Sequence, residues 1–494
     1  MQTKGFDNEK YLKEQSQAIL ERINLFESRL YLEFGGKIIY DYHAARVLPG
    51  YDPNTKVRLL QELKDKTEII LCISSGQIEK KKIRADFGIT YDIDLLRLID
   101  ELKKMELEVS AVIMTCFADQ PEAVVFKKKM ERMGIMVYAH RYTLGYPTDV
   151  DLIVSEQGYG ANQYIPISKP LVVVAGPGPG SGKLATALSQ LYHEHKQGIQ
   201  SGYAKFETFP VWDLPLRHPL NVAYEAASAD LGDYSLIDPF HLEEYKKVAI
   251  NYNRDIEIFP VLKRILEKII GNRLLYKSPT DMGVNKCSAG IENEEIIKKA
   301  CSDEIIRRYF RYNCEYNMGL ADKKTVQKTE LLMKELSISV EDREVVAFAR
   351  KAANEARLQG KESEGIFCGA AIQLPTGDIV TGKSFPLMHA SSSMVLNAVK
   401  VLSNVPDHIH LISPGIIESI ANFKKNIMKK KSVSLTLEET LVALSISSAT
   451  NPTAQLAMEK LNQLKGCEAH ITRMPLAGDE SALRQLKINL TSDC

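Results

Sequence analysis

A glycine-rich loop that ends in a lysine contains the residues with the clearest chemistry. Gly-Pro-Gly-Pro-Gly-Ser-Gly-Lys ends at Lys183, follows the apolar run 171–174 and precedes a segment with helical spacing of apolar residues. Glycines let backbone N–H groups approach an anion, the first turn of a helix adds partial positive charge, and lysine adds a full charge. The pattern therefore predicts a phosphate-binding site formed by Gly178, Gly180, Ser181, Gly182 and Lys183.

Two departures from the standard P-loop limit the chemistry expected at this loop. The pattern has a glycine six residues before the lysine, where this chain has Pro177. It also has Ser or Thr after the lysine to hold Mg²⁺, where this chain has Leu184. Phosphate or nucleotide binding is therefore expected, while magnesium-dependent hydrolysis of a nucleoside triphosphate is disfavoured. The alternative is a tight strand-to-helix turn without a ligand, although two prolines make the loop stiffer than such a turn requires.

The composition argues against several classes of protein. With 494 residues the chain is long enough for several domains. It has 63 basic and 63 acidic residues, and the lack of a basic excess argues against nucleic-acid binding. Its 8 cysteines form no C-x-x-C pair, so no zinc is expected. The sequence contains neither a signal peptide nor an apolar run long enough to span a bilayer, which predicts a soluble cytoplasmic protein with reduced thiols and no membrane partner.

Strand and helix patterns alternate along the first part of the chain. The predicted helices cover 11–32, 92–105 and 123–133, and the predicted buried strands cover 68–74, 109–114, 135–138, 151–154 and 171–174. This order predicts an α/β fold with a mostly parallel sheet covered by helices. Ligands bind beyond the carboxyl ends of such strands, and the glycine-rich loop begins at one of these ends.

Polar residues near the strand ends are candidate contacts for a ligand. Lys37, His43 and Arg46 lie upstream of the first predicted strand. Arg217 and His218 lie in a proline-rich segment that can form neither a helix nor a central strand. A surface turn with ordinary charge pairing is an equally good interpretation of these residues, because topology alone places them near the site.

An irregular loop at 276–285 lies within a helical region that starts near residue 225. Proline, glycine, aspartate and asparagine mark the loop, and long irregular loops often bind ligands. Its candidate contacts are Ser278, Thr280 and Asn285. A connector between domains is an equally good interpretation.

The candidates for general acid or base catalysis in the whole chain are His43, Asp86 and Asp281.

The last part of the chain resembles the cytidine-deaminase-like fold in its order of elements. A helix at 340–360, a hairpin around 375–377, a helix at 390–402 and a strand at 409–412 are predicted. The family carries His-Ala-Glu and Pro-Cys-x-x-Cys, where this chain has His389-Ala-Ser391 and Pro414-Gly-Ile-Ile-Glu418. Since zinc needs the thiolates and the deaminase reaction needs the glutamate, the resemblance implies the architecture without the zinc chemistry.

The whole chain resembles a bacterial family of uncharacterised proteins, protein family 0371, which contains the domain of unknown function 1846. Eight segments carry the resemblance: 34–37, 42–44, 46–50, 83–84, 86–92, 176–183, 218–221 and 278–285. The resemblance implies an N-terminal α/β part and a C-terminal deaminase-like part, and it implies no particular activity.

These patterns predict a chain in three parts. An α/β phosphate-binding domain over 1–225 is followed by a helical linking domain over 226–335 and a deaminase-like domain over 336–494. The leading hypothesis is an enzyme that acts on or uses a nucleotide or another phosphorylated small molecule, with a nucleotide as the candidate cofactor. The alternative is a non-catalytic protein that senses a phosphorylated metabolite. The helical segments leave room for a homo-oligomer, without selecting its symmetry.

Overall fold

The chain divides into two compact units. The computed structural model describes residues 4–26, 28–84, 88–271, 275–360 and 365–494. Of the described residues, the N-terminal unit comprises 4–228 and Asp233–Cys301, and the C-terminal unit comprises Ala229–Gly232 and Ser302–Cys494. Each unit has its own sheet and its own buried apolar core.

A parallel sheet forms the centre of the N-terminal unit. Its described strands have the order β11-β8-β1-β7-β2-β5-β6, and every neighbouring pair is parallel. The strands are β1 (Arg29–Phe34), β2 (Thr67–Ser74), β5 (Val109–Thr115), β6 (Val137–Ala139), β7 (Leu171–Ala175), β8 (Ser201–Phe206) and β11 (Gly283–Val284). The carboxyl ends of all these strands therefore lie at one edge of the sheet, where a ligand is expected.

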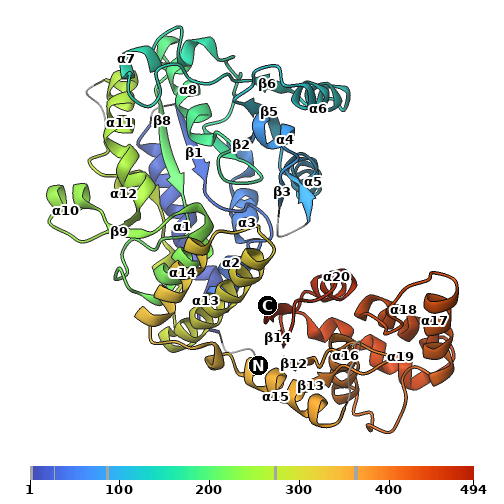
Figure 1. Cartoon of the computed structure of the whole chain (residues 1–494). Helices are drawn as coiled ribbons and strands as arrows, with labels where there is room; N and C mark the ends of the chain where they lie inside the picture. Colours follow the sequence, from blue (N-terminus) through green and yellow to red (C-terminus); the bar gives the residue numbers. More distant parts are fainter. Residues whose placement is uncertain (1–3, 27, 85–87, 272–274, 361–364) are drawn as a thin grey trace. The chain divides into compact units, whose positions relative to one another are not determined.

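Helices cover both faces of this sheet (Figure 1). Alternate side chains of β7 point to opposite faces, so Val173 and Ala175 enter one core while Val172 and Val174 enter the other. The first face is covered by α1 (Asn8–Asn24), α3 (Thr55–Glu62), α5 (Tyr91–Lys104) and α6 (Pro121–Arg132). The second face is covered by α7 (Val150–Ile153), α8 (Lys183–Lys196) and α11 (Asn253–Ile270). The strands are buried on both faces, which explains their nearly continuous apolar sequences.

Shorter elements complete the N-terminal unit. They are α2 (Tyr42–Val47), α4 (Ser75–Glu79), β3 (Ile83–Arg84), β4 (Ile89–Thr90), α9 (Pro219–Ala227), β9 (Ser235–Ile237), α10 (Pro239–Tyr245), β10 (Ile250–Tyr252) and α12 (Pro279–Met282). The helix α13 (Glu294–Asn317) begins in this unit and ends in the C-terminal unit. The predicted helical region from residue 225 therefore also contains short strands, and one of them, β11, belongs to the main sheet.

Several predicted elements of the N-terminal unit are confirmed, one predicted helix is too long, one predicted strand is wrong and one observed strand was not predicted. The strands β2, β5 and β7 and the helices α5 and α6 form where expected. The predicted helix 11–32 ends at Asn24, because the chain changes there to the alternating pattern of the central strand β1. The strand predicted at 151–154 is wrong, since most of these residues belong to the short helix α7, which begins after a side-chain cap from Asp149. The strand β8 has no counterpart among the predicted elements.

A smaller sheet forms the centre of the C-terminal unit. Its described strands have the order β13-β12-β14-β15, where β12 (Gly369–Gln373) is antiparallel to β13 (Ile379–Lys383) and to β14 (Glu468–Ile471), and β14 is parallel to β15 (Asn489–Ser492). The helices of this unit are α14 (Lys323–Glu335), α15 (Glu344–Leu358), α16 (Ala390–Leu402), α17 (Pro414–Asn426), α18 (Leu437–Ser448), α19 (Pro452–Glu459) and α20 (Ala477–Gln485). The predicted hairpin is confirmed as β12 and β13. The strand predicted at 409–412 is wrong, because these residues form bends whose buried apolar side chains Leu411 and Ile412 fill the core without strand pairing.

Replacement of Arg343 by alanine is expected to destabilise the C-terminal unit. The Arg343 side chain is 2% exposed, forms an ion pair with Glu468, and donates to the Thr491 hydroxyl at 3.2 Å and the Asn489 carbonyl at 2.8 Å. Loss of the guanidinium leaves these acceptors without their donor, so the free energy of unfolding is expected to fall by about 3 kcal/mol. Chemical denaturation of the variant measures this loss. Replacement of the exposed Arg357 of α15, the helix that follows Arg343, by alanine serves as the control and is expected to have little effect.

Candidate functional site

The glycine-rich loop lies at the carboxyl edge of the parallel sheet, near its middle. It connects β7 to α8, and β7 lies between β1 and β2. The chain after β7 crosses β1 to reach β8, whereas the chain after β2 runs the other way to β5. Neighbouring strands whose connections run in opposite directions leave a crevice at their carboxyl ends, and open α/β sheets bind ligands there.

The backbone of the loop leaves three N–H groups available. Gly180 and Gly182 adopt positive φ values of 68° and 85°, a region that strongly favours glycine. Among the described residues, no group accepts a hydrogen bond from the amides of Gly178, Gly180 or Gly182, whereas residues 179–180 form a hydrogen-bonded turn that engages the Ser181 amide. Three N–H groups next to the first turn of α8 are therefore free to bind an anion.

The loop is held in place through its carbonyl groups. The Thr115 hydroxyl donates to the Ser181 carbonyl at 2.8 Å, and the Gln77 amide donates to the Pro179 carbonyl at 2.9 Å. Side chains also press against the glycines, since a Cβ on Gly178 would lie 2.3 Å from the Tyr91 ring. The surrounding protein thus fixes the loop and uses none of its amide donors.

A buried hydroxyl group without a partner lies in the same loop. Ser181 is 0% exposed, and its Oγ has no hydrogen-bond partner among the described residues. The hydroxyl packs tightly against Gly176, because a Cβ built on Gly176 would lie 2.6 Å from it. A buried polar group without a partner costs free energy, and a bound ligand or an ordered water molecule would recover that cost.

Lys183 lies beside a carboxylate that the sequence patterns did not single out. Its Nζ is 3.9 Å from Oε1 of Glu33 on the neighbouring strand β1, and both side chains are 14% exposed. The Tyr203 hydroxyl of β8 donates to Oε2 of Glu33 at 2.8 Å. Burial and the Glu33 charge raise the pKa of Tyr203 well above its usual value, so the phenol keeps its proton and remains a donor. Among the described residues, the Lys183 ammonium has one rather long ion pair, which holds it near the loop.

A second group of polar side chains lies at the end of β8. Lys205 forms a close ion pair with Asp255 at the start of α11 and donates to the Tyr252 hydroxyl at 3.2 Å. Tyr252 in turn donates to Oε1 of Glu207 at 2.8 Å. Although burial disfavours the charged ammonium, the carboxylates of Asp255 and Glu207 raise the pKa of Lys205 well above its usual value. The signal for this group in the sequence is a lysine within a buried strand, and the signal was missed because β8 itself was not predicted.

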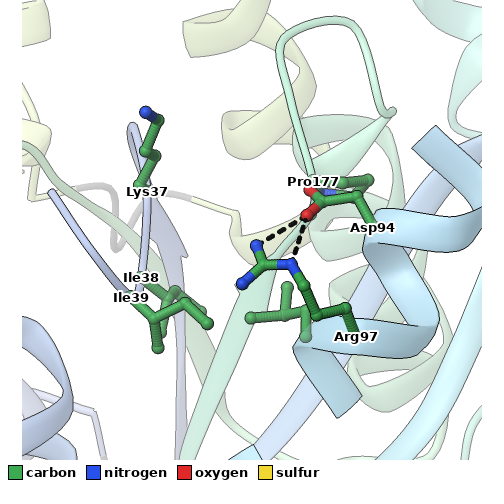
Figure 2. Close-up of a pocket in the computed structure, with 8 residues that line it drawn as sticks. Lys37, Ile38, Ile39, Asp94, Arg97 and Pro177 are labelled. Atoms are coloured by element: carbon green, nitrogen blue, oxygen red, sulfur yellow. Dashed lines mark hydrogen bonds and ion pairs between the residues drawn. The ribbon is translucent and has the colours of Figure 1, made fainter. Parts of the chain in front are cut away.

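A small pocket adjoins the start of the loop and brings one predicted contact to the site. Its lining includes Lys37, Asp94, Arg97, Gly176 and Pro177. Figure 2 shows the Arg97 guanidinium paired with Asp94 next to Pro177, and the Lys37 side chain extending from the opposite wall. Two cationic side chains therefore line the pocket beside the loop, and the Asp94 carboxylate neutralises the Arg97 charge.

The other upstream candidates lie elsewhere. His43 and Arg46 belong to α2, and the His43 ring packs edge-on against Phe209 with 5.6 Å between ring centroids. Arg217 lies 3.9 Å from the carboxylate of Glu225. The His218 ring accepts a hydrogen bond from Leu220 as the N-cap of α9, which is a structural role. Asp86 lies outside the described residues.

The candidate residues of the loop 276–285 form hydrogen bonds with each other and with adjacent parts of the chain. Ser278 and Asp281 form a reciprocal capping box at the start of α12. The Thr280 hydroxyl donates to Asp238 at 2.6 Å. The Asn285 amide donates to the carbonyls of residues 208 and 210. These side chains hold the loop to the edge of the sheet, so Asp281 has a local structural task away from the glycine-rich loop.

In the C-terminal unit, the residues that resemble the deaminase motif form a hydrogen-bonded group. Nδ1 of His389 lies 2.7 Å from Oδ2 of Asp479, and the Ser391 hydroxyl and the Leu437 amide donate to Oδ1 at 2.7 and 2.8 Å. Burial opposes ionisation of Asp479, but the hydrogen bonds and the His389 ring hold its pKa below the usual value. Within the part of the chain that the structure describes, no three His, Cys, Asp or Glu side chains gather as a metal site.

Replacement of Asp479 by asparagine is expected to lower the free energy of unfolding at neutral pH. It is also expected to make that free energy change less between neutral and acidic pH. A carboxylate whose folded pKa is depressed adds stability above its unfolded pKa of about 3.9. That stability disappears as the pH falls through the folded pKa. The variant is expected to lose about 2 kcal/mol at pH 7 and less at pH 3. Urea denaturation at both values measures this difference, with replacement of the exposed Asp407 by asparagine as the control.

None of the described helices has the length and apolar character needed to cross a bilayer.

Two family models together cover nearly the whole chain. Residues 4–337 match the family model described as "Domain of unknown function DUF1846, N-terminal", and residues 341–494 match "Domain of unknown function DUF1846, C-terminal". The chain is similar to the UPF0371 protein of Clostridium tetani (strain Massachusetts / E88), with 55% identity over 489 residues, 99% of this chain and 97% of that protein. Two UPF0371 proteins of Clostridium botulinum, from the strains Alaska E43 / Type E3 and ATCC 19397 / Type A, show the same identity over the same length.

Proposed function

Since the chain belongs to the DUF1846 family, whose description names no activity, we propose a function from the geometry of its glycine-rich loop. The loop binds the phosphate group of a small molecule, with a nucleotide as the leading candidate. The protein is an enzyme that acts on or uses this ligand. The observation that carries the proposal is the set of free amides at Gly178, Gly180 and Gly182 beside the ammonium of Lys183.

The proposed binding step exchanges one anionic partner of Lys183 for another. In the empty loop its ammonium lies 3.9 Å from Glu33, a separation at which an ion pair is weak. A bound phosphate carries more negative charge than a carboxylate and offers several acceptor oxygens. The ammonium therefore turns from Glu33 to the ligand, while the free amides donate to the remaining oxygens.

Magnesium is not needed for this binding step. The position that holds Mg²⁺ in a standard P-loop carries Leu184. The nearest hydroxyl along α8 belongs to Thr186, which is 0% exposed and accepts from the Cys72 thiol at 3.5 Å. This hydroxyl lies in the core and does not face the loop. We therefore expect the same ligand affinity with and without Mg²⁺, apart from the charge that the ion itself removes from the ligand.

A second proposal concerns the architecture of the C-terminal unit. We propose a deaminase-like arrangement without zinc chemistry. Its support is the antiparallel hairpin β12–β13 followed by α16, with His389 just before that helix. The bends at 409–412, in place of a strand, are a departure from that arrangement. Since His389 binds Asp479, its role here is to join α16 to α20.

Thermal melting with a panel of ligands tests the phosphate site. The panel contains ATP, ADP, AMP, sugar phosphates and inorganic pyrophosphate, each with and without Mg²⁺. A ligand that binds only the folded protein raises its melting temperature by mass action. We expect at least one phosphorylated compound to raise the melting temperature while its unphosphorylated counterpart has no effect. Turnover of that compound supports the enzyme, and binding without turnover supports the alternative of a sensor protein. No shift with any of them contradicts the proposal.

A further inference from the structure

Glu207 follows β8 at the same sheet edge as the glycine-rich loop, and it has no role in phosphate binding. We infer that Glu207 is the proton acceptor for the non-phosphate part of a ligand whose phosphate group is bound at the loop. The inference rests on the proposed function. It adds a substrate class, namely a nucleotide-sized molecule with a hydroxyl group that reaches Glu207 across the carboxyl end of β1.

The strand register gives the separation between Glu207 and the loop. Glu33 of β1 is paired with Lys205 of β8 on one side and with Val174 of β7 on the other. Two residues further along, Gly35 therefore lies between Glu207 and Gly176. The Gly35 amide donates to the Phe206 carbonyl at 2.8 Å, which shows that the pairing continues beyond β1. Neighbouring strands are about 4.8 Å apart, so Glu207 and the start of the loop are about 10 Å apart.

Gly35 leaves room for the Glu207 side chain above the neighbouring backbone positions of Glu207, Gly35 and Gly176. A Cβ on Gly35 would lie 2.7 Å from Cγ of Glu207, so the glutamate stem crosses the space that any larger residue would fill. The stem therefore runs across β1, which is the direction of the glycine-rich loop on β7. A ligand at the carboxyl edge would pass over Gly35 between its phosphate site and Glu207.

One oxygen of the Glu207 carboxyl group is anchored and the other is available. Oε1 accepts from the Tyr252 hydroxyl at 2.8 Å, while Oε2 accepts no hydrogen bond from any described residue. Oε2 is not fully buried, so it is accessible from the solvent side. A fixed carboxylate with one open oxygen is the arrangement that a general base requires.

The surrounding charges set Glu207 to exchange a proton near neutral pH. Burial and the neighbouring Asp255 raise its pKa to about 7, although Lys205 acts in the opposite direction. The titratable or charged groups that face this region are Glu33 of β1, Tyr203 and Lys205 of β8, Tyr224 of α9, Tyr252 of β10, and Arg254 and Asp255 of α11. Since Lys205 is committed to Asp255, the Glu207 carboxylate is not locked into an ion pair.

The proton transfer itself is simple. The O–H bond of a ligand hydroxyl breaks, the proton forms a new bond to Oε2 of Glu207, and the electron pair remains on the ligand oxygen. Before the transfer, the hydroxyl donates a hydrogen bond to the ionised carboxylate, which strengthens binding. The ligand therefore binds more tightly above the pKa of Glu207 than below it.

A comparison of ADP with inorganic pyrophosphate tests this inference. Both contain a diphosphate for the loop, but only ADP carries ribose hydroxyl groups that extend away from it. Calorimetric titration at pH 6 and pH 8 with the full-length protein measures their affinities. We expect the affinity for ADP, relative to pyrophosphate, to be about 10-fold higher at pH 8 than at pH 6, because a hydrogen bond to a charged group forms.

The variant Glu207→Gln keeps the shape of the side chain and removes its ionisation. We expect its affinity for ADP, relative to pyrophosphate, to be the same at pH 6 and pH 8, so that the pH step seen in the wild-type protein is lost. We expect it to bind pyrophosphate as the wild-type protein does. Glu257→Gln, at a position of α11 away from this group, is the matched control and is expected to keep the step. Tyr252→Phe removes the donor to Oε1 and is expected to shift the step to higher pH, which provides a second readout if Glu207→Gln folds poorly.

The outcomes separate this inference from the proposed function. An equal pH step for ADP in the wild-type protein and in Glu207→Gln overturns the role of Glu207 and leaves phosphate binding intact. Loss of both ligands in Lys183→Ala, with the step unchanged in Glu207→Gln, leads to the same conclusion. Failure of the wild-type protein to bind either compound overturns the proposed function and this inference together.

Discussion

Replacement of Lys183 by alanine is expected to weaken the binding of phosphorylated ligands by about 100-fold. The variant loses a charge-assisted hydrogen bond to phosphate, which is worth about 1.5–3 kcal/mol. The fold is expected to survive, because the only ion pair of this lysine among the described residues is the 3.9 Å contact with Glu33. Calorimetric titration with the compound that gives the largest thermal shift measures the change in dissociation constant.

Two further variants show whether the loss comes from this charge alone. Lys196→Ala removes an exposed lysine from the other end of α8, where it pairs with Glu156, and is expected to leave binding unchanged. Glu33→Gln removes the carboxylate that competes with the ligand for Lys183, so binding is expected to stay equal or become tighter. An equal loss of binding in Lys183→Ala and Lys196→Ala would mean that overall charge, rather than the loop, attracts the ligand.

Replacement of Gly182 by alanine is expected to damage both the loop and the stability of the N-terminal unit. The residue has a φ of 85°, and a Cβ at this position would lie 2.6 Å from the Thr115 side chain. The strained backbone and the displaced Thr115 together are expected to cost about 2–4 kcal/mol of unfolding free energy. Ligand binding is also expected to fall, because the Thr115 hydroxyl holds the Ser181 carbonyl.

Gly180→Ala provides a matched control for this effect. Gly180 has a similar φ of 68°, but nothing lies within 4 Å of a Cβ built there. The control therefore carries the backbone strain without the collision, and a loss of about 1 kcal/mol is expected. Denaturation curves of the two variants compare the two costs. Equal destabilisation would contradict the tight packing of Gly182 against Thr115.

The sequence was informative where local chemistry decides the structure. The loop at 176–183 was recognisable because its glycines, its lysine and its flanking elements are contiguous in the chain. The parallel sheet was predictable because buried strands such as β2 and β7 are continuous apolar runs between helical patterns. Both signals depend on short segments, and together they predicted that the loop lies at the carboxyl edge of the sheet, as it does in the structure.

The partners of the loop were not predictable, because they come from distant parts of the chain. Glu33 lies on β1, which was hidden within an overlong predicted helix, and Glu207 follows β8, which gave no clear strand pattern. The two strands are neighbours only after the sheet has assembled around β1. A charged residue within a buried strand is the signal that would have found Glu33 and Lys205.

Some candidate residues have local structural roles, and they show where a pattern of polar residues in the sequence is ambiguous. Ser278, Asp281 and His218 are polar residues in irregular segments, which is the usual pattern of a binding loop. The same residue types also cap helices, and here they cap α12 and α9. Sequence alone did not separate the two roles, because both place polar side chains just before a helix.

The most direct test of the phosphate site is a crystal structure of the protein with the ligand that the thermal-shift panel selects. Phosphate oxygens are expected within hydrogen-bonding distance of the amides of Gly178, Gly180 and Gly182, with the Lys183 ammonium turned from Glu33 to the ligand. Electron density for the ligand at another place on the protein, with this loop empty and Lys183 still beside Glu33, would contradict the account.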